Sequence, residues 1–454
     1  MLINFKRHLS SCLDEWKQNE QRKPLILRGA RQVGKTTLVR QFAQKYKHSI
    51  LLNLEKESDK RWLEEFDDVK IIVEALLVKH NISSNDLHKT LLFLDEIQES
   101  PKAIQLLRYF YEEIPELHII AAGSLLEFAM RKVKSFPVGR VEYLNLNPLN
   151  FLEYLRAINH QVALDQINEI PVNNFAHKTL LDLFNHYAII GGMPEVIQTY
   201  ILKKSITDLP RVYESIWGTY QDDVVKYTSN DTERKIIKHI ISTAHLYIDQ
   251  RIKFHNFGNS NYRSREVGEA MRNLDDASII QLIYPSTDLQ PPLKPDIKKS
   301  PRLQFLDTGI VNYSLNIQAD MLGISDLSST YKGSIIPHIV YQELMSLNTT
   351  NQNKPPFWVR EKKQSSAEVD IIITHNNKAI PVEIKSGSTG RLRSLHQFID
   401  LCSHSYAIRI YAGEYKVEMS KTPAGKPFLI MNLPYYLGTK IPEYIDYFLS
   451  NYKL

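Results

Sequence analysis

The sequence predicts an α/β protein of several domains, and three features of its pattern support this prediction. In the first third of the chain, short apolar runs alternate with stretches of helical periodicity, which is typical of a mainly parallel sheet covered by helices. From about residue 151 to 227 the pattern is helical throughout, and from residue 302 helix and strand patterns mix again. A length of 454 residues allows roughly three domains, each with a core.

The strands expected in the first sheet are five short, mostly apolar runs. They are residues 24–28, 49–54, 90–94, 118–122 and 141–146. The helix after the first strand is expected because apolar residues share one face at a period of 3.6 residues. They are Leu38, Val39, Phe42, Ala43 and Tyr46. We assign residues 1–155 to this first domain.

The rest of the chain divides into three further segments. Residues 156–228 are helical and are interrupted by Gly191-Gly192-Met193-Pro194, which predicts a helical lid. Residues 229–300 are expected to form helices, a closing strand at 279–284 and an extended linker, because five prolines fall between residues 285 and 301. Residues 301–454 are expected to form a last α/β domain.

The composition excludes several classes of protein. With 43% apolar and 24% charged residues, the chain is neither disordered nor fibrous. Its apolar runs are far shorter than the ~20 residues of a membrane-spanning helix, so no membrane span is expected. Residues 1–7 do not resemble a secretory signal, and the only cysteines, Cys12 and Cys402, fit a reducing compartment. These features predict a cytoplasmic protein. The net charge of +5 identifies no partner by itself.

The strongest chemical motif lies directly after the first predicted strand. Residues 29–36 fit the pattern G-x-x-x-x-G-K-[ST], the P-loop, between an apolar strand and a periodic helix. The glycines let backbone N–H groups point at a phosphate, Lys35 reaches the outer phosphates, and the Thr36 hydroxyl can hold magnesium. An incidental glycine turn is the alternative. The residues expected to bind ATP are Gly29, Ala30, Arg31, Gln32, Val33, Gly34, Lys35, Thr36 and Thr37.

An acidic motif follows the predicted strand at 90–94. The strand ends in Asp95 and Glu96, and carboxylates at the C-terminal end of a parallel strand face the ligand crevice. We expect Asp95, with Thr36, to hold Mg²⁺, and Glu96 to orient or deprotonate the attacking water. Ser124, after the next strand, is expected either to hydrogen-bond the water or terminal phosphate or to cap a helix.

Phosphoryl transfer also needs a cation against the charge that develops on the terminal phosphate, often an arginine of a neighbouring subunit. Arg140, which follows Gly139 at the start of the fifth strand, is the candidate. This role would require a homo-oligomer. The alternative is an ordinary surface arginine.

Taken in order, these motifs resemble those of a known group of proteins. They are residues 29–36, 95–98, 123–124, 139–140, 148, 149, 151 and 191–194. The set resembles the AAA+-type ATPases of bacteria and archaea that carry a C-terminal domain of largely unassigned function, and the similarity extends over nearly the whole chain. The resemblance implies ATP binding, an AAA+ sheet with a helical lid, and a winged helix after the lid.

The middle segment contains a partial basic cluster. Between Arg251 and Arg272 lie Lys253, His255, Arg263 and Arg265. A helix at 264–274 followed by a strand suits a winged helix, whose basic residues meet DNA phosphates. Four acidic residues dilute this charge. DNA contact and a packing module between the ATPase and the tail are therefore both open interpretations.

The tail carries a second pattern that indicates chemistry. Residues 368–373 and 379–385 flank a turn at Asn376-Asn377 and predict a hairpin. Side chains two positions apart on a strand share a face, so Glu383 and Lys385 point together, and Asp370 approaches them across the pairing. Two carboxylates and a lysine so placed suit a divalent cation and an attacked phosphodiester.

This hairpin resembles the core of the PD-(D/E)xK nucleases. The resemblance implies that residues 301–454 form a nuclease-like α/β domain in which Asp370 and Glu383 hold the metal ion. A helical glutamate usually completes such a site, and Glu343 is the match. Two alternatives stay open: a hairpin whose polar residues face solvent, and a degenerate nuclease fold used only for binding.

The sequence therefore predicts an ATPase that uses ATP and Mg²⁺. The leading hypothesis is a nucleic-acid-associated ATPase with a metal-dependent nuclease tail and DNA as its partner. The competing hypothesis is an ATP-gated switch that binds a protein partner and carries a catalytically inactive tail.

Overall fold

A five-stranded sheet forms the first part of the structure, a computed structural model that describes residues 3–124, 126, 139–226, 228, 230–323, 327, 330, 333–349, 354–362, 365–385 and 392–454. The strands are β1 (Leu25–Arg28), β2 (His48–Asn53), β3 (Thr90–Asp95), β4 (His118–Ala122) and β5 (Glu142–Asn145). The helices are α1 (Leu9–Gln18), α2 (Lys35–Ala43), α3 (Glu57–Glu64), α4 (Val69–Lys79), α5 (Pro101–Glu113) and the short η1 (Ser84–Lys89) and η2 (Ile97–Glu99). All five strands lie where the sequence predicts them.

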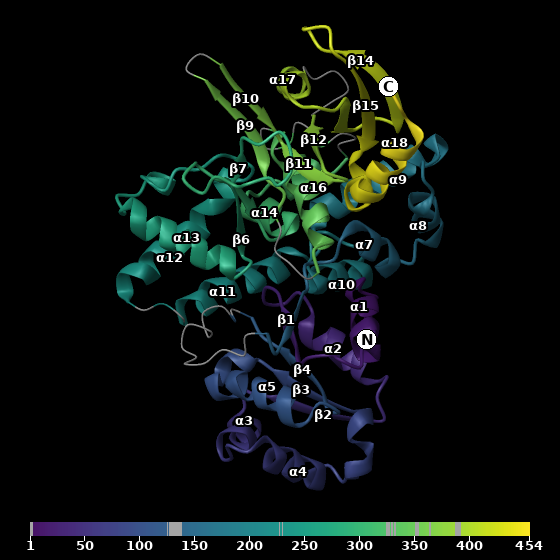
Figure 1. The fold of residues 1–454 in the computed structure, drawn as a ribbon. Coiled ribbons are helices and arrows are strands. Elements are labelled where there is room, and N and C mark those ends of the chain that lie inside the picture. Colours follow the sequence, from purple (N-terminus) through teal and green to yellow (C-terminus); the bar gives the residue numbers. More distant parts are fainter. Residues whose placement is uncertain are drawn as a thin grey trace.

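The strand order of this sheet is β2-β3-β4-β1-β5, and all neighbouring strands are parallel. Successive side chains of a strand point to opposite faces, so Leu25 and Leu27 pack with α1 and α2, whereas Ile26 packs with α4 and α5. The sheet is thus the middle layer of three (Figure 1). Because the strands are parallel, the loops after β1, β3 and β4 leave the sheet at the same edge.

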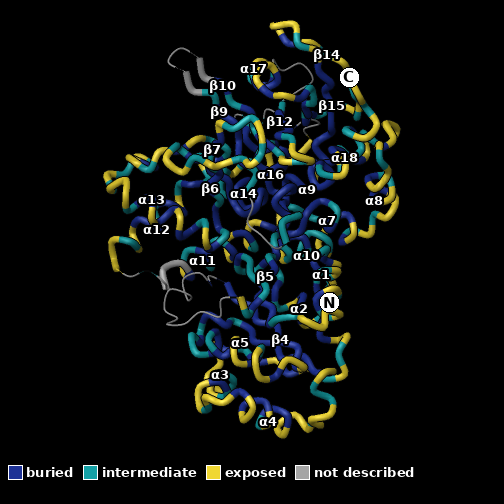
Figure 2. Tube along the Cα trace, viewed as in Figure 1, coloured by how far each residue is buried: buried dark blue, intermediate teal, exposed yellow. Residues whose placement is uncertain are grey.

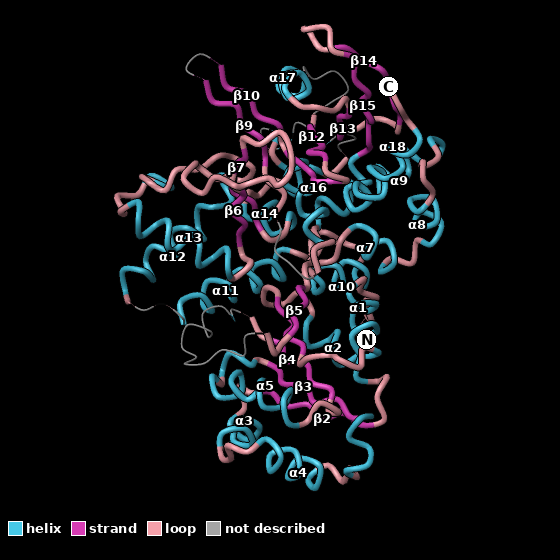
Figure 3. Tube along the Cα trace, in the orientation of Figure 1, coloured by secondary structure: helices cyan, strands magenta, loops and turns pink. Residues whose placement is uncertain are grey.

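Helices dominate the next part of the chain, as the periodicity predicts (Figure 3). They are α7 (Phe151–Ala157), α8 (Gln161–Asn168), η3 (Asn174–Ala176), α9 (His177–Ile190), α10 (Pro194–Lys203) and α11 (Pro210–Lys226). Asn150 begins α7 with a capping box, in which its side chain and that of Glu153 each accept a backbone N–H of the other. Gly191 ends α9 with a φ of 71°, a conformation that glycine adopts without strain.

Two helices and a two-stranded ladder follow. The elements are α12 (Asp231–Ala244), η4 (His245–Tyr247), η5 (Phe257–Asn259), α13 (Ser264–Asp276), β6 (Ile280–Ile283), β7 (Pro285–Ser286) and β8 (Arg302–Phe305). β6 pairs with β8 in antiparallel register. The proline-rich segment expected to be a linker therefore connects two paired strands, and the expected boundary at residue 300 falls between these partners. The winged-helix assignment stays a prediction.

The C-terminal part contains a second five-stranded sheet, of order β11-β12-β13-β15-β14, and a three-stranded sheet, β10-β9-β7. The strands are β9 (Phe357–Lys362), β10 (Ser365–Val369), β11 (Ile371–His375), β12 (Lys378–Ile384), β13 (Tyr406–Tyr411), β14 (Lys416–Lys421) and β15 (Pro427–Pro434). The helices are α14 (Thr308–Ser314), α15 (Gln318–Met321), α16 (Ile335–Ser346), α17 (Arg393–Leu401), η7 (Tyr435–Lys440) and α18 (Ile441–Asn451).

The predicted hairpin is present, with one correction. β11 and β12 pair in antiparallel register across Asn376 and Asn377, which both have positive φ. The strand expected to run on from Glu368 is broken at Asp370, because β10 pairs with β9 in the other sheet. Asp370 therefore lies at the junction of two sheets.

Buried side chains connect the three parts of the chain. One continuous apolar core includes Leu13 of α1, Phe184 of α9 and Phe448 of α18, and buried residues run through all three parts in Figure 2. The parts are therefore expected to respond to one another, because packed interiors transmit strain. Among the described residues, no helix is long and apolar enough to cross a membrane. The domain boundaries at residues 155, 228 and 300 stay predictions.

Candidate functional site

The loop after β1 has the backbone that a phosphate cradle requires. Gly29 and Gly34 have φ values of 141° and 98°, and a Cβ atom on Gly29 would lie 2.2 Å from the Leu146 carbonyl oxygen. The Lys35 Nζ donates hydrogen bonds to the Gly29 and Ala30 carbonyls, at 2.9 and 2.8 Å. Burial lowers the pKa of Lys35 to about 8, so most of these amines still carry a charge at neutral pH.

The acidic motif meets this loop at the same edge of the sheet. The Thr36 hydroxyl donates a hydrogen bond of 2.9 Å to Asp95 Oδ2, and burial raises the pKa of Asp95. Hydroxyl and carboxylate oxygens are ligands that suit Mg²⁺. Glu96 has a φ of 53° and accepts a 2.6 Å hydrogen bond from Gln98 Nε2. The structure thus brings Lys35, Thr36, Asp95 and Glu96 together.

A cavity of about 510 Å³ opens over Lys35, Thr36 and Glu96, within the size range of small-molecule sites. It is lined by the P-loop and α2, by Glu96, by the N-terminal segment and by the first turns of α10. The lining residues are Ile3, Phe5, Arg7, Arg31, Gln32, Gly34, Lys35, Thr36, Thr37, Leu38, Gln41, Glu96, Pro194, Glu195 and Gln198.

The tail has an acidic site of its own on the predicted hairpin. Lys385 Nζ lies 2.6 Å from Glu383 Oε1, and Asp370 Oδ2 accepts a 2.8 Å hydrogen bond from the Ile384 N–H. Burial, and then the Asp370 charge, raise the pKa of Glu383 to about 8. Burial alone would lower the pKa of Lys385, but the Glu383 carboxylate raises it. The sequence correctly anticipates that these three side chains converge.

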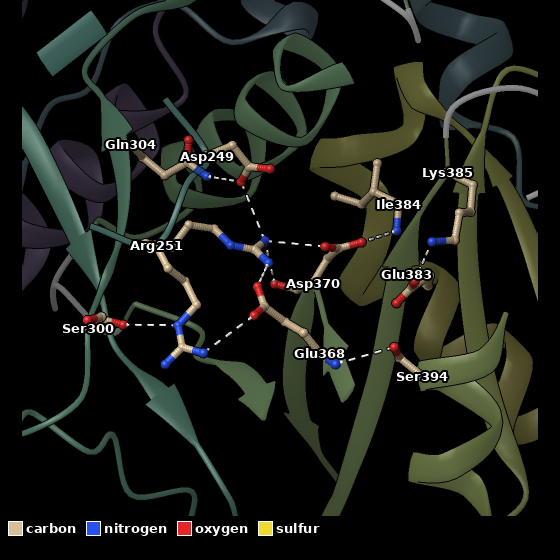
Figure 4. A network of polar contacts seen from close by, with 11 residues as sticks. Asp249, Arg251, Ser300, Gln304, Glu368, Asp370, Glu383, Ile384, Lys385 and Ser394 are labelled. Atoms are coloured by element: carbon tan, nitrogen blue, oxygen red, sulfur yellow. Dashed lines mark hydrogen bonds and ion pairs between the residues drawn. The ribbon is translucent and has the colours of Figure 1, made fainter. Parts of the chain in front are cut away.

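Arg302 of β8 joins this acidic site. Its guanidinium lies 3.3 Å from Asp370 Oδ1 and 3.4 Å from Asp249 Oδ1, and it also pairs with Glu368. Figure 4 shows these carboxylates around one guanidinium, with Glu383 and Lys385 beyond Asp370. Among the described residues, no group of three or more His, Cys, Asp or Glu side chains is arranged to hold a metal ion.

Comparison with protein families identifies the first part of the chain. Residues 21–155 match the family described as an AAA domain, and these residues contain the P-loop, Asp95 and Glu96. The chain contains a P-loop ATPase domain of the AAA type. Residues 181–321 and 332–435 match two domains of unknown function, DUF8612 and DUF4143. The nuclease-like fold of the tail and the winged helix therefore stay predictions.

Solved structures include several that are similar to this chain at low identity. The Walker-type ATPase PABY2304 of Pyrococcus abyssi is 15% identical with a TM-score of 0.44, over 68% of this chain and 96% of that one. The STAND protein PH0952 of Pyrococcus horikoshii is 11% identical with a TM-score of 0.27, over 76% and 47%. The S. cerevisiae Hsp104-ADP complex is 11% identical with a TM-score of 0.28, over 61% and 40%. A search of curated proteins gave no match.

Arg7 is a residue of the ATPase site that sequence reasoning missed. Its guanidinium donates a hydrogen bond to the Val33 carbonyl in the P-loop at 2.9 Å, and it pairs with Glu153 of α7 at 3.1 Å. The Ile3 N–H donates to Gln198 Oε1 of α10. The N-terminal segment thus ties the P-loop to the helices beside it. A lone arginine in a mixed polar sequence gives no signal of this role.

The helix α11 also contacts the P-loop of the ATPase. Arg31 forms an ion pair with Asp223, and the Tyr220 hydroxyl donates a 2.8 Å hydrogen bond to the Arg31 carbonyl. Asp223 and Tyr220 lie in the segment that matches DUF8612. Arg31 therefore links the nucleotide loop to the next part of the chain.

Ser124 and Arg140 differ in their position relative to the ATPase site. Ser124 is buried directly after β4, and the strand order puts this strand between β1 and β3. Arg140 precedes β5, pairs with Glu112 at 2.9 Å and has a partly exposed side chain. It lies at the sheet edge opposite the P-loop, because the nucleotide loops follow the C-terminal ends of the strands. Arg140 therefore does not reach the ATP site of its own chain.

Glu343 is not brought to the acidic site of the tail. Its carboxylate accepts hydrogen bonds from the Phe151 N–H at 3.1 Å and lies 2.7 Å from the Tyr187 hydroxyl. These partners belong to the helices after the ATPase sheet, so Glu343 holds the tail against them. Burial raises the pKa of Glu343 to about 8.

Some basic residues of the middle segment already contact other residues of the same chain. Arg251 lies 3.9 Å from Glu368 and donates to the Ser300 carbonyl, and Arg272 bonds to Tyr284. These contacts reduce the charge available for DNA phosphates.

Proposed function

We propose that this ATPase is a nucleotide-gated switch whose output is the position of the tail. Lys35 would bind the outer phosphates, Thr36 and Asp95 would hold Mg²⁺, and Glu96 would orient or deprotonate the attacking water. Mg²⁺ would neutralise the charge that develops on the phosphates. Ser124 would report the terminal phosphate.

One hydrogen bond carries the proposal. Asp307 Oδ2 accepts a 2.6 Å hydrogen bond from the Gly192 N–H. Gly192 lies two residues before Pro194, which lines the nucleotide cavity. The same turn is fixed from the ATPase side, because the Leu149 N–H donates to the Gly192 carbonyl at 2.7 Å. A change at α10 would therefore reach Asp307 directly.

Asp307 also connects this turn to helices α14 and α16. Its Oδ1 accepts the Ile310 N–H at 3.1 Å and so caps α14. Gln342 of α16 bonds to the Thr308 N–H at 2.9 Å and to the Tyr187 hydroxyl at 3.3 Å. A Cβ atom on Gly309 would lie 2.2 Å from the Ile190 carbonyl oxygen. This close fit favours movement of α9, α14 and α16 together.

Amide hydrogen exchange of the full chain tests the switch. A non-hydrolysable ATP analogue with Mg²⁺ should change the exchange of Gly192, of Ile310 and of the first turn of α14. The variant Lys35→Ala, which keeps the turn but binds phosphate poorly, is the control and should show no change. Unaltered exchange beyond α10 in the wild-type chain at saturating analogue would contradict the proposal.

A second candidate function is cleavage of DNA by the tail. It is favoured by the convergence of Asp370, Glu383 and Lys385. Incubation of plasmid DNA with the full chain and Mg²⁺ or Mn²⁺ separates the two functions. Cleavage that disappears in Asp370→Asn would support a nuclease, whereas intact DNA supports the switch with an inactive tail. DNA retention in a filter-binding assay would test nucleic-acid association.

A further inference from the structure

The acidic site of the tail contains a buried carboxylate oxygen with no partner. Among the described residues, Glu383 Oε2 has no hydrogen-bond partner, although its side chain is only 4% exposed. An unsatisfied buried oxygen of this kind is costly. Asp370 lies beside it, held by the Ile384 N–H. Glu383 Oε2 is thus a buried acceptor that a cation placed beside Asp370 would satisfy.

The guanidinium of Arg302 supplies positive charge to one side of this site. Its side chain is 8% exposed and contacts Asp370, Asp249 and Glu368. Three carboxylates so close to one another repel unless a cation lies between them. The ring of Phe357 covers the guanidinium, with 4.9 Å between Arg302 Cζ and the ring centroid. These contacts hold Arg302 in place. Arg302 lies in the segment that matches DUF8612, whereas Asp370 lies in the segment that matches DUF4143.

We propose that Arg302 is an internal cation that takes the place of a divalent metal ion at Asp370 and Glu383. With Arg302 in place, one Asp370 oxygen faces the guanidinium and the other accepts a backbone N–H, so a metal ion at Asp370 would have to compete with the positive charge of Arg302. With the charge of Arg302 removed, Asp370 and Glu383 together bind one Mn²⁺ or Mg²⁺. This inference rests on the proposed function, in which the tail is catalytically inactive, and it gives a reason for that inactivity.

Binding of Mn²⁺ to the full chain without nucleotide tests this inference. Free Mn²⁺ is measured by its electron paramagnetic resonance signal for the wild type, Arg302→Gln and the double variant Arg302→Gln/Glu383→Gln. We expect Arg302→Gln to bind one Mn²⁺ per chain more than the wild type, and the double variant to lose it. Saturating Mn²⁺ should also raise the melting temperature of Arg302→Gln by at least about 2 °C more than that of the wild type.

Arg251→Gln is the matched control. Arg251 is a second arginine beside the acidic site and lies 3.9 Å from Glu368. If the effect belongs to the guanidinium of Arg302, loss of Arg251 should add no Mn²⁺ site. A gain in this variant would show that general loss of positive charge is enough and would overturn the inference. Because no nucleotide is added, failure here leaves the exchange test of the switch unaffected.

Loss of Arg302 leaves buried carboxylates unpaired and can prevent folding. Recovery of the folded state by Mn²⁺ would then support the inference, since the metal replaces the guanidinium. The second variant is Arg302→Lys. It keeps the positive charge of Arg302, but its ammonium group is smaller than the guanidinium and contacts fewer carboxylates at once. The inference is wrong if the wild type binds Mn²⁺ through Glu383, if folded Arg302→Gln binds no more than the wild type, or if neither variant folds with Mn²⁺.

Discussion

Arg302 and Asp307 lie five positions apart, at the two ends of one short segment that begins with β8. Arg302 contacts Asp370 in the tail at 3.3 Å, and Asp307 accepts the Gly192 N–H beside the nucleotide cavity at 2.6 Å. β8 is held in register by β6, which favours movement of the segment as a unit. The same short segment thus contacts both the turn beside the ATP site and the acidic site of the tail.

Asp307→Asn is expected to uncouple the tail from the nucleotide. Both Asp307 oxygens accept backbone N–H groups, and an amide offers only one acceptor, so one N–H loses its partner. We expect unfolding free energy to fall by about 1–3 kcal/mol. ATP affinity, measured by calorimetry, should change by less than about threefold, while the exchange response in α14 is lost. Asp400→Asn, at an exposed position, is the control and should keep the response.

Lys35→Ala and Glu96→Gln are expected to fail at different steps. Lys35 would contact phosphates in the bound state, so its loss lowers nucleotide affinity in calorimetry. Glu96 would act on the water, so Glu96→Gln should bind ATP normally and release phosphate about 10²–10⁴-fold more slowly. Normal phosphate release by either variant would contradict these roles.

A catalytic role of Arg140 would have to be at the ATP site of a neighbouring chain. Mixing Arg140→Ala chains with Lys35→Ala chains should then recover part of the ATPase rate, because each chain supplies what the other lacks. The mixture is compared with each variant alone at equal total concentration, after co-assembly is shown by light scattering. No recovery at any mixing ratio would leave Arg140 a surface residue paired with Glu112.

The P-loop ATPase core could be predicted because its signals are local. The apolar run before Gly29 and the pair Asp95-Glu96 each lie within a few residues, and backbone geometry decides where they point. The bonds between Asp307 and Gly192 and between Arg302 and Asp370 join residues 115 and 68 positions apart. No periodicity encodes such pairs, because tertiary packing alone brings them together.

Glu343 shows how a correct residue type can be given the wrong surroundings. A glutamate on a helix before the hairpin suits a nuclease site, but α16 directs this one to the Phe151 N–H. The helix is apolar on nearly every side, with almost all of its residues buried, so the sequence pattern does not reveal which face meets which neighbour. Contacts to α7 and α9 decide the outcome.

Glu343 also predicts a loss of stability as pH rises. Its pKa is raised from 4.5 to about 8 by burial, so the folded chain keeps a proton that the unfolded chain loses in this range. The contribution of Glu343 is therefore fully present below about pH 4.5 and is lost as pH rises towards 8. The slope from this group is at most about 1.4 kcal/mol per pH unit. The measurement is the unfolding free energy in urea at pH 6 and pH 8.

Glu343→Gln should flatten this pH dependence, because the amide is neutral throughout. The Tyr187 hydroxyl has one hydrogen, yet it lies within 2.8 Å of both the Leu149 carbonyl and Glu343 Oε1. Both contacts are satisfied when Tyr187 donates to Leu149 and a protonated Glu343 donates to Tyr187, and the side-chain amide of the variant would donate in the same way. The loss between pH 6 and pH 8 should be smaller in Glu343→Gln by up to about 2.7 kcal/mol. Burial likewise raises the pKa of Asp249 to about 7, and this contribution stays in both proteins. Equal losses in the two proteins would mean that Glu343 is ionised in the folded chain at pH 6.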